Sequence, residues 1–253
     1  MENISATWSE RDLDEIKRSE IEASRIVLTP INVRRYASPP PDTAYALEFA
    51  YYLLGNVRGR KVLDLGCGSG ENMVVLASRG ADVIGIDISP HLVELARQRL
   101  SPMGKSDRAR VATAYATGLP DESVDAVFAI AVLHHLDLTV VREEIRRVLR
   151  KNGLFIFSEP IRFSRALRTV RKLMPARDEV SSYEHPLDRG EIAEITKGFT
   201  ILMQRNFQLP FVPLLGGRRV NHDKRIWEAD RWLNLHFPKL EHYATLKVMS
   251  MRK

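Results

Sequence analysis

The feature that most restricts how this chain can fold is a strand pattern that runs directly into three glycines and then into a helix. Residues 62–65 form a short, largely apolar run, Gly66, Gly68 and Gly70 follow at alternate positions, and a helical pattern starts at Glu71. Glycines permit a tight turn and leave the N–H groups of a helix start open to a ligand. The segment therefore predicts a buried strand, a ligand-binding turn and a helix.

The same alternation of strand and helix continues along the chain. Strands that alternate with helices of about ten residues are typical of βαβ units. We therefore expect an α/β fold, doubly wound, with a mostly parallel seven-stranded sheet. The other expected strands are 82–87, 110–113, 124–131, 154–158, 200–207 and 245–251, and the expected helices are 71–78, 91–100, 139–149, 189–196 and 226–233.

Two additions to this domain are expected. Residues 1–42 read as an N-terminal helical arm or lid, with a polar helix at about 10–26 and three prolines near its end. Residues 43–253 should form the main domain, and Asp42 or Thr43 can cap a helix that runs to about residue 54. A helical cap insertion is expected after the fifth strand, at about 160–188.

Composition excludes several classes of protein. The hydrophobic fraction of 44% is enough for a core, and one cysteine rules out a disulfide framework or a zinc site built on several thiolates. The start has no signal-peptide pattern and no run is long enough to span a membrane, so a cytoplasmic location is expected. No carboxylate cluster has the spacing of a metal site, so no metal is expected.

Two acidic residues indicate the kind of ligand. Asp64 stands two positions before the first glycine, where a carboxylate is badly placed for a phosphate and well placed for an ammonium. Asp87 ends the second expected strand, where an acid can bind the two hydroxyls of a ribose. The expected ligand is a nucleoside that carries an amino acid.

At these residues the chain resembles the class I S-adenosylmethionine-dependent methyltransferases, of the small-molecule type 11 kind. The resemblance covers roughly residues 60–159, and the segments 118–125, 131–136 and 149–160 match further family elements in order. It implies a Rossmann-like fold and S-adenosylmethionine as cofactor. The cofactor-binding residues that it implies are Asp64, Gly66, Cys67, Gly68, Gly70, Asp87, Ile88, Tyr115, Ala116 and Ala131.

One position departs from the family pattern. The family often has an aspartate two residues before the position of Thr117, and this chain has Tyr115 there. Adenine recognition is therefore expected to rest on the N–H of Ala116, with Tyr115 as a packing residue. Cys67, in the glycine loop, is interpreted as a small packing residue rather than a nucleophile.

Methyl transfer by in-line displacement requires alignment and exclusion of water, and needs a base only if the acceptor must lose a proton. His134, His135 and Glu159 follow the fourth and fifth strands, where folds of this class expose their ligand crevice. We expect them to be the catalytic candidates, with packing and capping as the alternative roles. Tyr36 on the arm and His185 in the insertion are the candidate substrate-binding residues, against a role as ordinary surface residues.

The expected function is S-adenosylmethionine-dependent methylation of a small, apolar or aromatic metabolite, with O-, N- and C-methylation left open. The alternatives are an RNA methyltransferase, suggested by the net charge of +6, and a non-catalytic cofactor-binding protein. The basic residues of an expected helix in the insertion are Arg162, Arg165, Arg168, Arg171 and Lys172. No aromatic residues are interleaved with this basic face, which disfavours nucleic acid as a partner. A basic helix in the insertion leaves a peripheral lipid contact open, and a homodimer is also left open.

Overall fold

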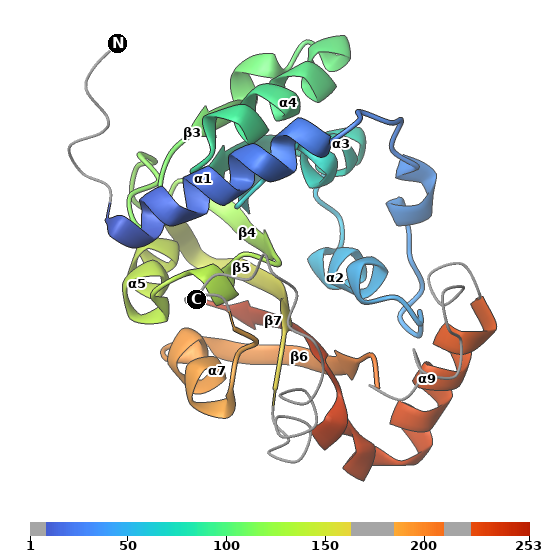
Figure 1. Cartoon of the computed structure of the whole chain (residues 1–253). Coiled ribbons are helices and arrows are strands. Elements are labelled where there is room, and N and C mark those ends of the chain that lie inside the picture. Colours follow the sequence, from blue (N-terminus) through green and yellow to red (C-terminus); the bar gives the residue numbers. More distant parts are fainter. Residues whose placement is uncertain (1–8, 163–184, 210–223) are drawn as a thin grey trace.

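A mixed seven-stranded sheet forms the centre of the molecule. The computed structural model describes residues 9–162, 185–209 and 224–253. The sheet order is β3-β2-β1-β4-β5-β7-β6, and β7 is antiparallel to both of its neighbours. This confirms the predicted doubly wound, mostly parallel fold (Figure 1). The strands are β1 Lys61–Leu65, β2 Asp82–Asp87, β3 Ala109–Val111, β4 Val124–Ile130, β5 Leu149–Pro160, β6 Thr200–Phe207 and β7 Leu246–Arg252.

Helices cover both faces of this sheet. One apolar cluster joins the sheet to the second, third and fourth helices, and a second cluster joins its other face to α5 and α7. The helices are α1 Glu10–Arg25, α2 Ala46–Leu54, α3 Glu71–Ser78, α4 Pro90–Leu100, α5 Leu138–Val148, α7 Arg189–Thr196 and α9 Lys224–His236. The short 3₁₀ turns are Val33–Tyr36, Ser101–Met103, Ser106–Arg108, Leu133–His135 and Pro238–Tyr243.

The alternation of side chains along the strands explains why both faces are buried. In β1, Val62 belongs to the cluster under α2 and α3, whereas Leu63 and Leu65 belong to the cluster under α5. All three side chains are fully buried. Neighbouring side chains on a strand point to opposite faces, so a strand covered on both sides needs an apolar residue at nearly every position. Asp64 is an exception, because it is an acidic residue at a fully buried position of β1.

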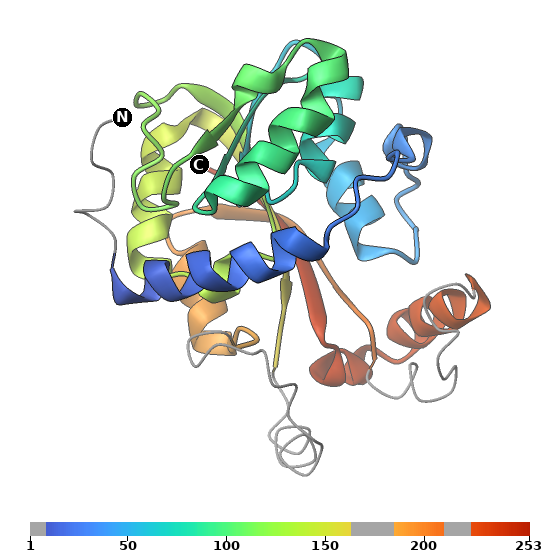
Figure 2. The ribbon, with the colours of Figure 1, turned by 45° about the horizontal axis from the view of Figure 1, so that its top comes forward.

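α1 lies over one end of the sheet. It begins with a capping box, in which the Ser9 hydroxyl accepts from the Asp12 N–H and the Asp12 carboxylate accepts from the Ser9 N–H. The helix then crosses the molecule and packs against α4, as Figures 1 and 2 show. Arg99 in α4 donates to the carbonyl of Thr29 at 2.8 Å and holds the chain that follows α1.

Two predicted boundaries are wrong. α2 begins at Ala46 behind Tyr45, so neither Asp42 nor Thr43 is its N-cap. Thr43 instead accepts a hydrogen bond from the Tyr45 N–H at 3.2 Å, which turns the chain before the helix. β5 begins at Leu149, directly after α5, because its backbone is already extended there. Most of the predicted insertion, including its basic helix, lies outside the described residues.

Candidate functional site

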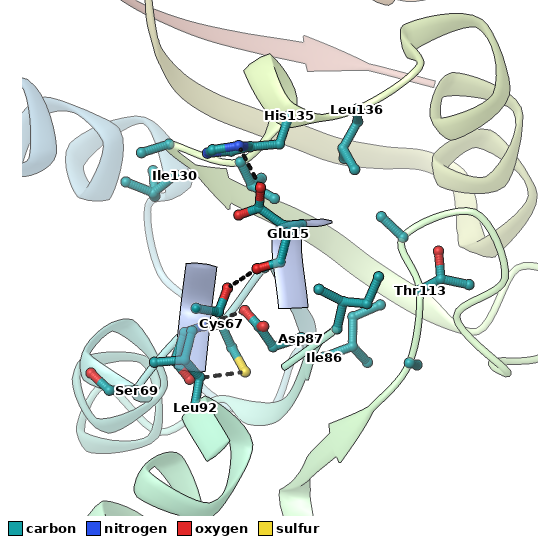
Figure 3. A pocket seen from close by; sticks show the side chains of 18 of the residues that line it. Glu15, Cys67, Ser69, Ile86, Asp87, Leu92, Thr113, Ile130, His135 and Leu136 are labelled. Atoms are coloured by element: carbon teal, nitrogen blue, oxygen red, sulfur yellow. Dashed lines mark hydrogen bonds and ion pairs between the residues drawn. The ribbon is translucent and has the colours of Figure 1, made fainter. Parts of the chain in front are cut away.

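A cavity of about 420 Å³ opens where β1, β2 and β4 end. The loops that follow these strands line it on one side, and α1 lies over it with Arg11, Asp12, Glu15 and Ser19 in the lining (Figure 3). Open α/β sheets bind ligands at the carboxyl ends of their strands, on either side of the point where the strand order reverses. Here the order reverses between β1 and β4. The cavity is therefore where this fold is expected to bind a ligand.

The glycine loop forms the floor of the cavity with its backbone. Gly66, Gly68 and Gly70 all have positive φ, at 71°, 50° and 83°. A Cβ at Gly66 would lie 2.4 Å from a methyl group of Val132, and one at Gly70 would lie 2.8 Å from Ala96. A Cβ at Gly68 would meet nothing within 4 Å among the described residues. Gly66 and Gly70 are thus required by packing, whereas Gly68 leaves open space on the cavity side.

Asp87 connects the end of β2 to this loop. Its carboxylate accepts from the Gly68 N–H and from the Ser89 N–H, both at 2.9 Å. Ser89, rather than Asp87, caps α4 by accepting from the Leu92 N–H. Asp87 lines the cavity together with Ile88.

Asp64 is fully buried behind the loop. Neither of its oxygens has a hydrogen-bond partner among the described residues, and it lies behind the cavity lining rather than in it. Burial, and secondly the charge of Asp87, raise the pKa of Asp64 well above its ordinary value. An unpartnered buried carboxyl group of this kind fits a cationic ligand group, which would supply the missing partner.

Cys67 lines the cavity and is buried. Burial, with the charges of Asp64 and Asp87, raises the pKa of its thiol well above the ordinary value. A thiol that stays protonated is a poor nucleophile.

The segment after β3 forms another wall. Ala112, Thr113 and Ala114 line the cavity, and Tyr115 and Ala116 lie just beyond this lining. The Ala116 N–H, expected to face adenine, donates instead to the carbonyl of Thr113 at 3.2 Å. The Tyr115 hydroxyl accepts from the Asp137 N–H at 2.8 Å, which fixes this segment to the start of α5.

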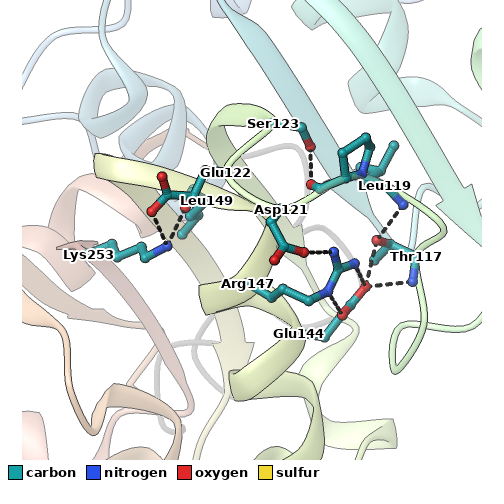
Figure 4. A network of polar contacts seen from close by, with 10 residues as sticks. Thr117, Leu119, Asp121, Glu122, Ser123, Glu144, Arg147, Leu149 and Lys253 are labelled. Carbon is teal, nitrogen blue, oxygen red and sulfur yellow. Dashed lines mark hydrogen bonds and ion pairs between the residues drawn. The ribbon is translucent and has the colours of Figure 1, made fainter.

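A polar network holds the next part of this segment against α5 (Figure 4). Thr117 donates to Glu144 through its N–H and its hydroxyl, both at 2.7 Å. Arg147 binds the same carboxylate at 2.7 Å and also binds Asp121 at 2.6 Å. Burial would raise the pKa of Glu144, but the hydrogen bonds from Arg147 and Thr117 outweigh it and lower the pKa. Glu144 is therefore ionised, and its carboxylate holds Thr117 against α5.

Glu159 is fully buried and supports the loop after β4. It accepts from the N–H groups of Val132 and Leu133, at 2.8 and 2.7 Å, and contacts the Nδ1 atom of His134 at 2.7 Å. Ala131 stands at the start of this loop with a φ of 55°, lines the cavity and donates to the carbonyl of Ser158. Glu159 thus shapes the cavity from behind through these bonds.

The two histidines of this loop have different positions. His134 is turned towards Glu159 and is 8% exposed, whereas His135 lines the cavity. Their rings lie 4.0 Å apart. The Nδ1 atom of His135 lies 3.2 Å from the Glu15 carboxylate, which reaches it from α1 (Figure 3). Glu15 is not among the residues predicted from the sequence, because a single acid on a polar helix gives no signal of a functional site.

The two predicted substrate-binding residues lie away from the lining. The Tyr36 ring contacts the Tyr51 ring at a tilt of 42°, with centroids 5.0 Å apart, and packs against the core under α2. The Nε2 atom of His185 lies 2.8 Å from Glu191, whose carboxylate also takes part in the capping box of α7. Neither Tyr36 nor His185 lines the cavity that His135 lines.

Comparison with known proteins agrees with this geometry. A family model described as a methyltransferase domain matches residues 63–157, which run from β1 into β5. This part of the chain is thus similar to a methyltransferase domain. That match includes the glycine loop, Asp87 and both histidines.

Curated relatives support this methyltransferase domain over part of their length. Sterol 4-C-methyltransferase strm-1 of Caenorhabditis elegans is 36% identical over 103 residues, which are 40% of this chain and 31% of the relative. Magnesium-protoporphyrin O-methyltransferase of Rhodobacter capsulatus is 51% identical over 70 residues, or 28% of this chain and 31% of the relative. The matches thus span about a third of these two relatives.

Solved structures share the fold of the whole chain. Geranyl diphosphate C-methyltransferase from Streptomyces coelicolor A3(2), solved with Mg²⁺, geranyl diphosphate and S-adenosyl-L-homocysteine, has a TM-score of 0.63 at 15% identity and covers 96% of this chain and 98% of its own. The [4+2]-cyclase SpnF has a TM-score of 0.59 at 17% identity, over 95% of this chain and 93% of its own. At these identities the likeness shows the Rossmann-like fold alone.

The part of the chain that the structure describes is residues 9–162, 185–209 and 224–253. Within them, no three histidine, cysteine or acidic side chains are grouped so that they could hold a metal ion. In the same part of the chain, every helix is too short or too polar to cross a membrane.

Proposed function

We propose that this protein transfers a methyl group from S-adenosylmethionine to a small-molecule acceptor. The observation that carries the proposal is the cradle made by Gly68 and Asp87, whose carboxylate lines the cavity while it holds the loop N–H at 2.9 Å. An acid at the tip of the second strand suits a ribose diol, and an open glycine backbone suits a ligand that comes close.

The other contacts of the cofactor follow from the same cradle. Asp64 would stabilise the ammonium of the methionine part, since its buried carboxyl group has no other partner among the described residues. Ile88 and the wall at 112–114 would contact the base, and the loop from Ala131 would contact the methyl-bearing end. Tyr115 would act through the wall, because its hydroxyl is bound to the N–H of Asp137.

The protein's contribution to the reaction is alignment and exclusion of water. S-adenosylmethionine supplies the methyl group on a positively charged sulfur, and this charge disperses as the methyl group leaves. A low-dielectric, closed site favours such a step. The segment 1–42 would provide this closure, because α1 within it covers the cavity.

The acceptor would meet both apolar and charged groups. Val132 and Leu136 line the cavity near His135, and Arg11 and Glu15 face it from α1. An apolar molecule with one polar reacting group fits this lining, and the named sterol and geranyl diphosphate relatives agree with that class. A lipid contact through the insertion and a homodimer stay predictions.

Calorimetry with S-adenosylhomocysteine tests the cofactor part of the proposal. The folded protein should bind it at a single site, and the absence of binding would contradict the proposal. Turnover is then tested by incubation with methyl-labelled S-adenosylmethionine and a cell extract, followed by fractionation of the labelled products. Binding without any labelled product would favour a non-catalytic cofactor-binding protein on the same fold.

A further inference from the structure

The Glu15 carboxylate contacts the His135 ring where α1 meets the rest of the fold. The carboxylate lies 3.2 Å from Nδ1, and the two side chains are 29% and 22% exposed. Both line the cavity, so the pair faces the space where an acceptor would react. The two residues are 120 positions apart in the chain, and only the placement of α1 brings them together.

The charges around the pair favour an ionised Glu15. Burial alone would raise the pKa of Glu15, but the hydrogen bond and charge of His135, then the charges of His134 and Arg18, outweigh burial and lower it. Arg18 in turn binds Asp14 at 3.0 Å. His134 on the other side is held by Glu159.

The remaining charged groups of the lining come from α1, β2 and α3. Arg11 and Asp12 lie on α1 with Glu15, and Asp87 lies at the end of β2. Glu71 at the start of α3 also lines the cavity. The Glu15 carboxylate contacts the His135 ring at 3.2 Å.

We infer that Glu15 is a positioning residue that makes His135 the general base of the methyl transfer. The inference rests on the proposed function. With the Nδ1 proton donated to Glu15, the lone pair of the neutral ring is on Nε2. In the transfer, a lone pair of the acceptor forms the new bond to the methyl carbon, and the carbon–sulfur pair stays on sulfur. The acceptor's proton passes to Nε2, and from there to solvent after product release.

Glu15 contributes in two ways to this step. It selects the tautomer and ring orientation of His135, and its negative charge stabilises the imidazolium that forms. Because Glu15 lies on α1, the base is complete only while α1 covers the cavity. Closure and proton acceptance are thereby linked through one pair of side chains.

The same helix provides a matched control. Glu20 on α1 lies 3.6 Å from Nδ1 of His91 on α4, and both side chains are exposed, at 48% and 66%. A Glu20→Gln change removes the same charge from the same helix, but away from the cavity. Glutamine is close in size to glutamate, and its side-chain oxygen can still accept from Nδ1 of His135. Glu15→Gln therefore removes the charge but keeps the contact with the ring.

The first experiment measures the titration of the His135 ring by NMR in protein saturated with S-adenosylhomocysteine. The ring signals are assigned by their loss in His135→Gln. We expect Glu15→Gln to move the titration midpoint of His135 to lower pH, and Glu15→Asp to move it less far. Glu20→Gln should leave this midpoint unchanged. A midpoint that is the same in wild type and Glu15→Gln would overturn the inference.

The second experiment measures labelled methyl transfer into the extract as a function of pH. We expect His135→Gln to lower the rate about 10²- to 10⁴-fold, as for loss of a general base. Glu15→Gln should lower it about tenfold on the alkaline side, and less on the acid side, because the lower midpoint keeps more of the variant's ring neutral there. The affinity for S-adenosylhomocysteine should change less than about twofold.

Different results would contradict the proposed function and the role of Glu15. A wild-type protein that binds no S-adenosylhomocysteine would contradict the proposed function itself. Binding and turnover in the wild type, with Glu15→Gln lowering cofactor affinity and rate together, would assign Glu15 to closure of the site and overturn its role on His135. Circular dichroism and the thermal unfolding midpoint of Glu15→Gln should match those of the wild type, which would show that the change leaves the fold intact.

Discussion

Asp64 and Asp87 lie at the ends of neighbouring parallel strands, and the two carboxyl groups have opposite environments. Asp87 receives two backbone N–H donors at 2.9 Å, whereas both oxygens of Asp64 lack a partner among the described residues. Burial first, and the charge of Asp87 second, raise the pKa of Asp64. Asp64 is thus costly to ionise until a cation reaches it, and a cofactor ammonium would offset that cost.

Asp64→Asn should stabilise the protein without cofactor at neutral pH and weaken cofactor binding. The folded-state pKa of Asp64 is above its unfolded value, so the folded state binds more protons, and stability falls as pH rises from about 4 through the raised pKa. Asparagine lacks this titration. We expect a gain of about 1–3 kcal/mol at neutral pH, measured by urea unfolding.

Thermal unfolding over a range of pH provides the control for Asp64→Asn. The wild type should lose stability with rising pH relative to the variant, and S-adenosylhomocysteine should narrow the difference. Parallel pH curves for the two proteins would show that Asp64 already has a partner in the folded state.

Asp87→Ala should weaken the binding of S-adenosylhomocysteine. It removes a charged acceptor from the cavity and leaves the Gly68 N–H without its partner. The expected loss is about 1.5–3 kcal/mol, or about tenfold to 150-fold in affinity, measured by calorimetry. Asp82→Ala, at the other end of β2, breaks only an ion pair with Arg108 at 3.1 Å and should leave the affinity unchanged. Equal affinities in all three proteins would refute the ribose role.

Gly70→Ala should destabilise the fold more than Gly104→Ala. Both glycines have positive φ, at 83° and 65°, so each change incurs backbone strain of about 1–2 kcal/mol. At Gly70 the new Cβ would also lie 2.8 Å from Ala96, whereas at Gly104 it meets nothing within 4 Å in the described structure. We expect a further loss of about 1–3 kcal/mol at Gly70 in urea unfolding. Equal losses would mean that α3 and α4 can separate without cost.

Short-range patterns made much of the fold predictable. α3 at 71–78 and β2 at 82–87 have the predicted bounds, because glycine or proline limits each apolar run. The junction between α5 and β5 was placed wrongly, since no such residue separates them. Leu149 is buried in the structure and continues the apolar pattern of both elements.

The site was predictable only where chemistry depends on local spacing. The glycine loop and Asp87 follow from their positions after strands. Glu15 could not be found, because its role depends on where α1 crosses the sheet, and an isolated polar helix does not encode that. Tyr36 was predicted as a substrate-binding residue because it lies on the N-terminal arm. In the structure its ring packs on Tyr51.

Glu144→Gln should loosen the cavity wall at 112–117, with a cost that depends on pH. Glu144 is 8% exposed and accepts from Thr117 and from Arg147, and these bonds lower its pKa despite its burial. A lowered carboxyl pKa contributes stability above the unfolded value, and this is lost as pH falls through the folded value. With Arg147 partly exposed to solvent, we expect about 1–2 kcal/mol at neutral pH.

The matched control for this change is Glu143→Gln on the same helix. Glu143 is 64% exposed and pairs with Arg142, so its loss should change stability by less than about 0.5 kcal/mol. Urea unfolding at neutral and at acid pH should show the Glu144→Gln difference shrink towards acid, and hydrogen exchange should quicken at the amide of Thr117, which loses its charged acceptor. The ionised carboxylate is the form of Glu144 that makes charge-assisted bonds to Thr117 and Arg147. An equal loss of stability at neutral and acid pH would therefore show that the charge of Glu144 does not contribute.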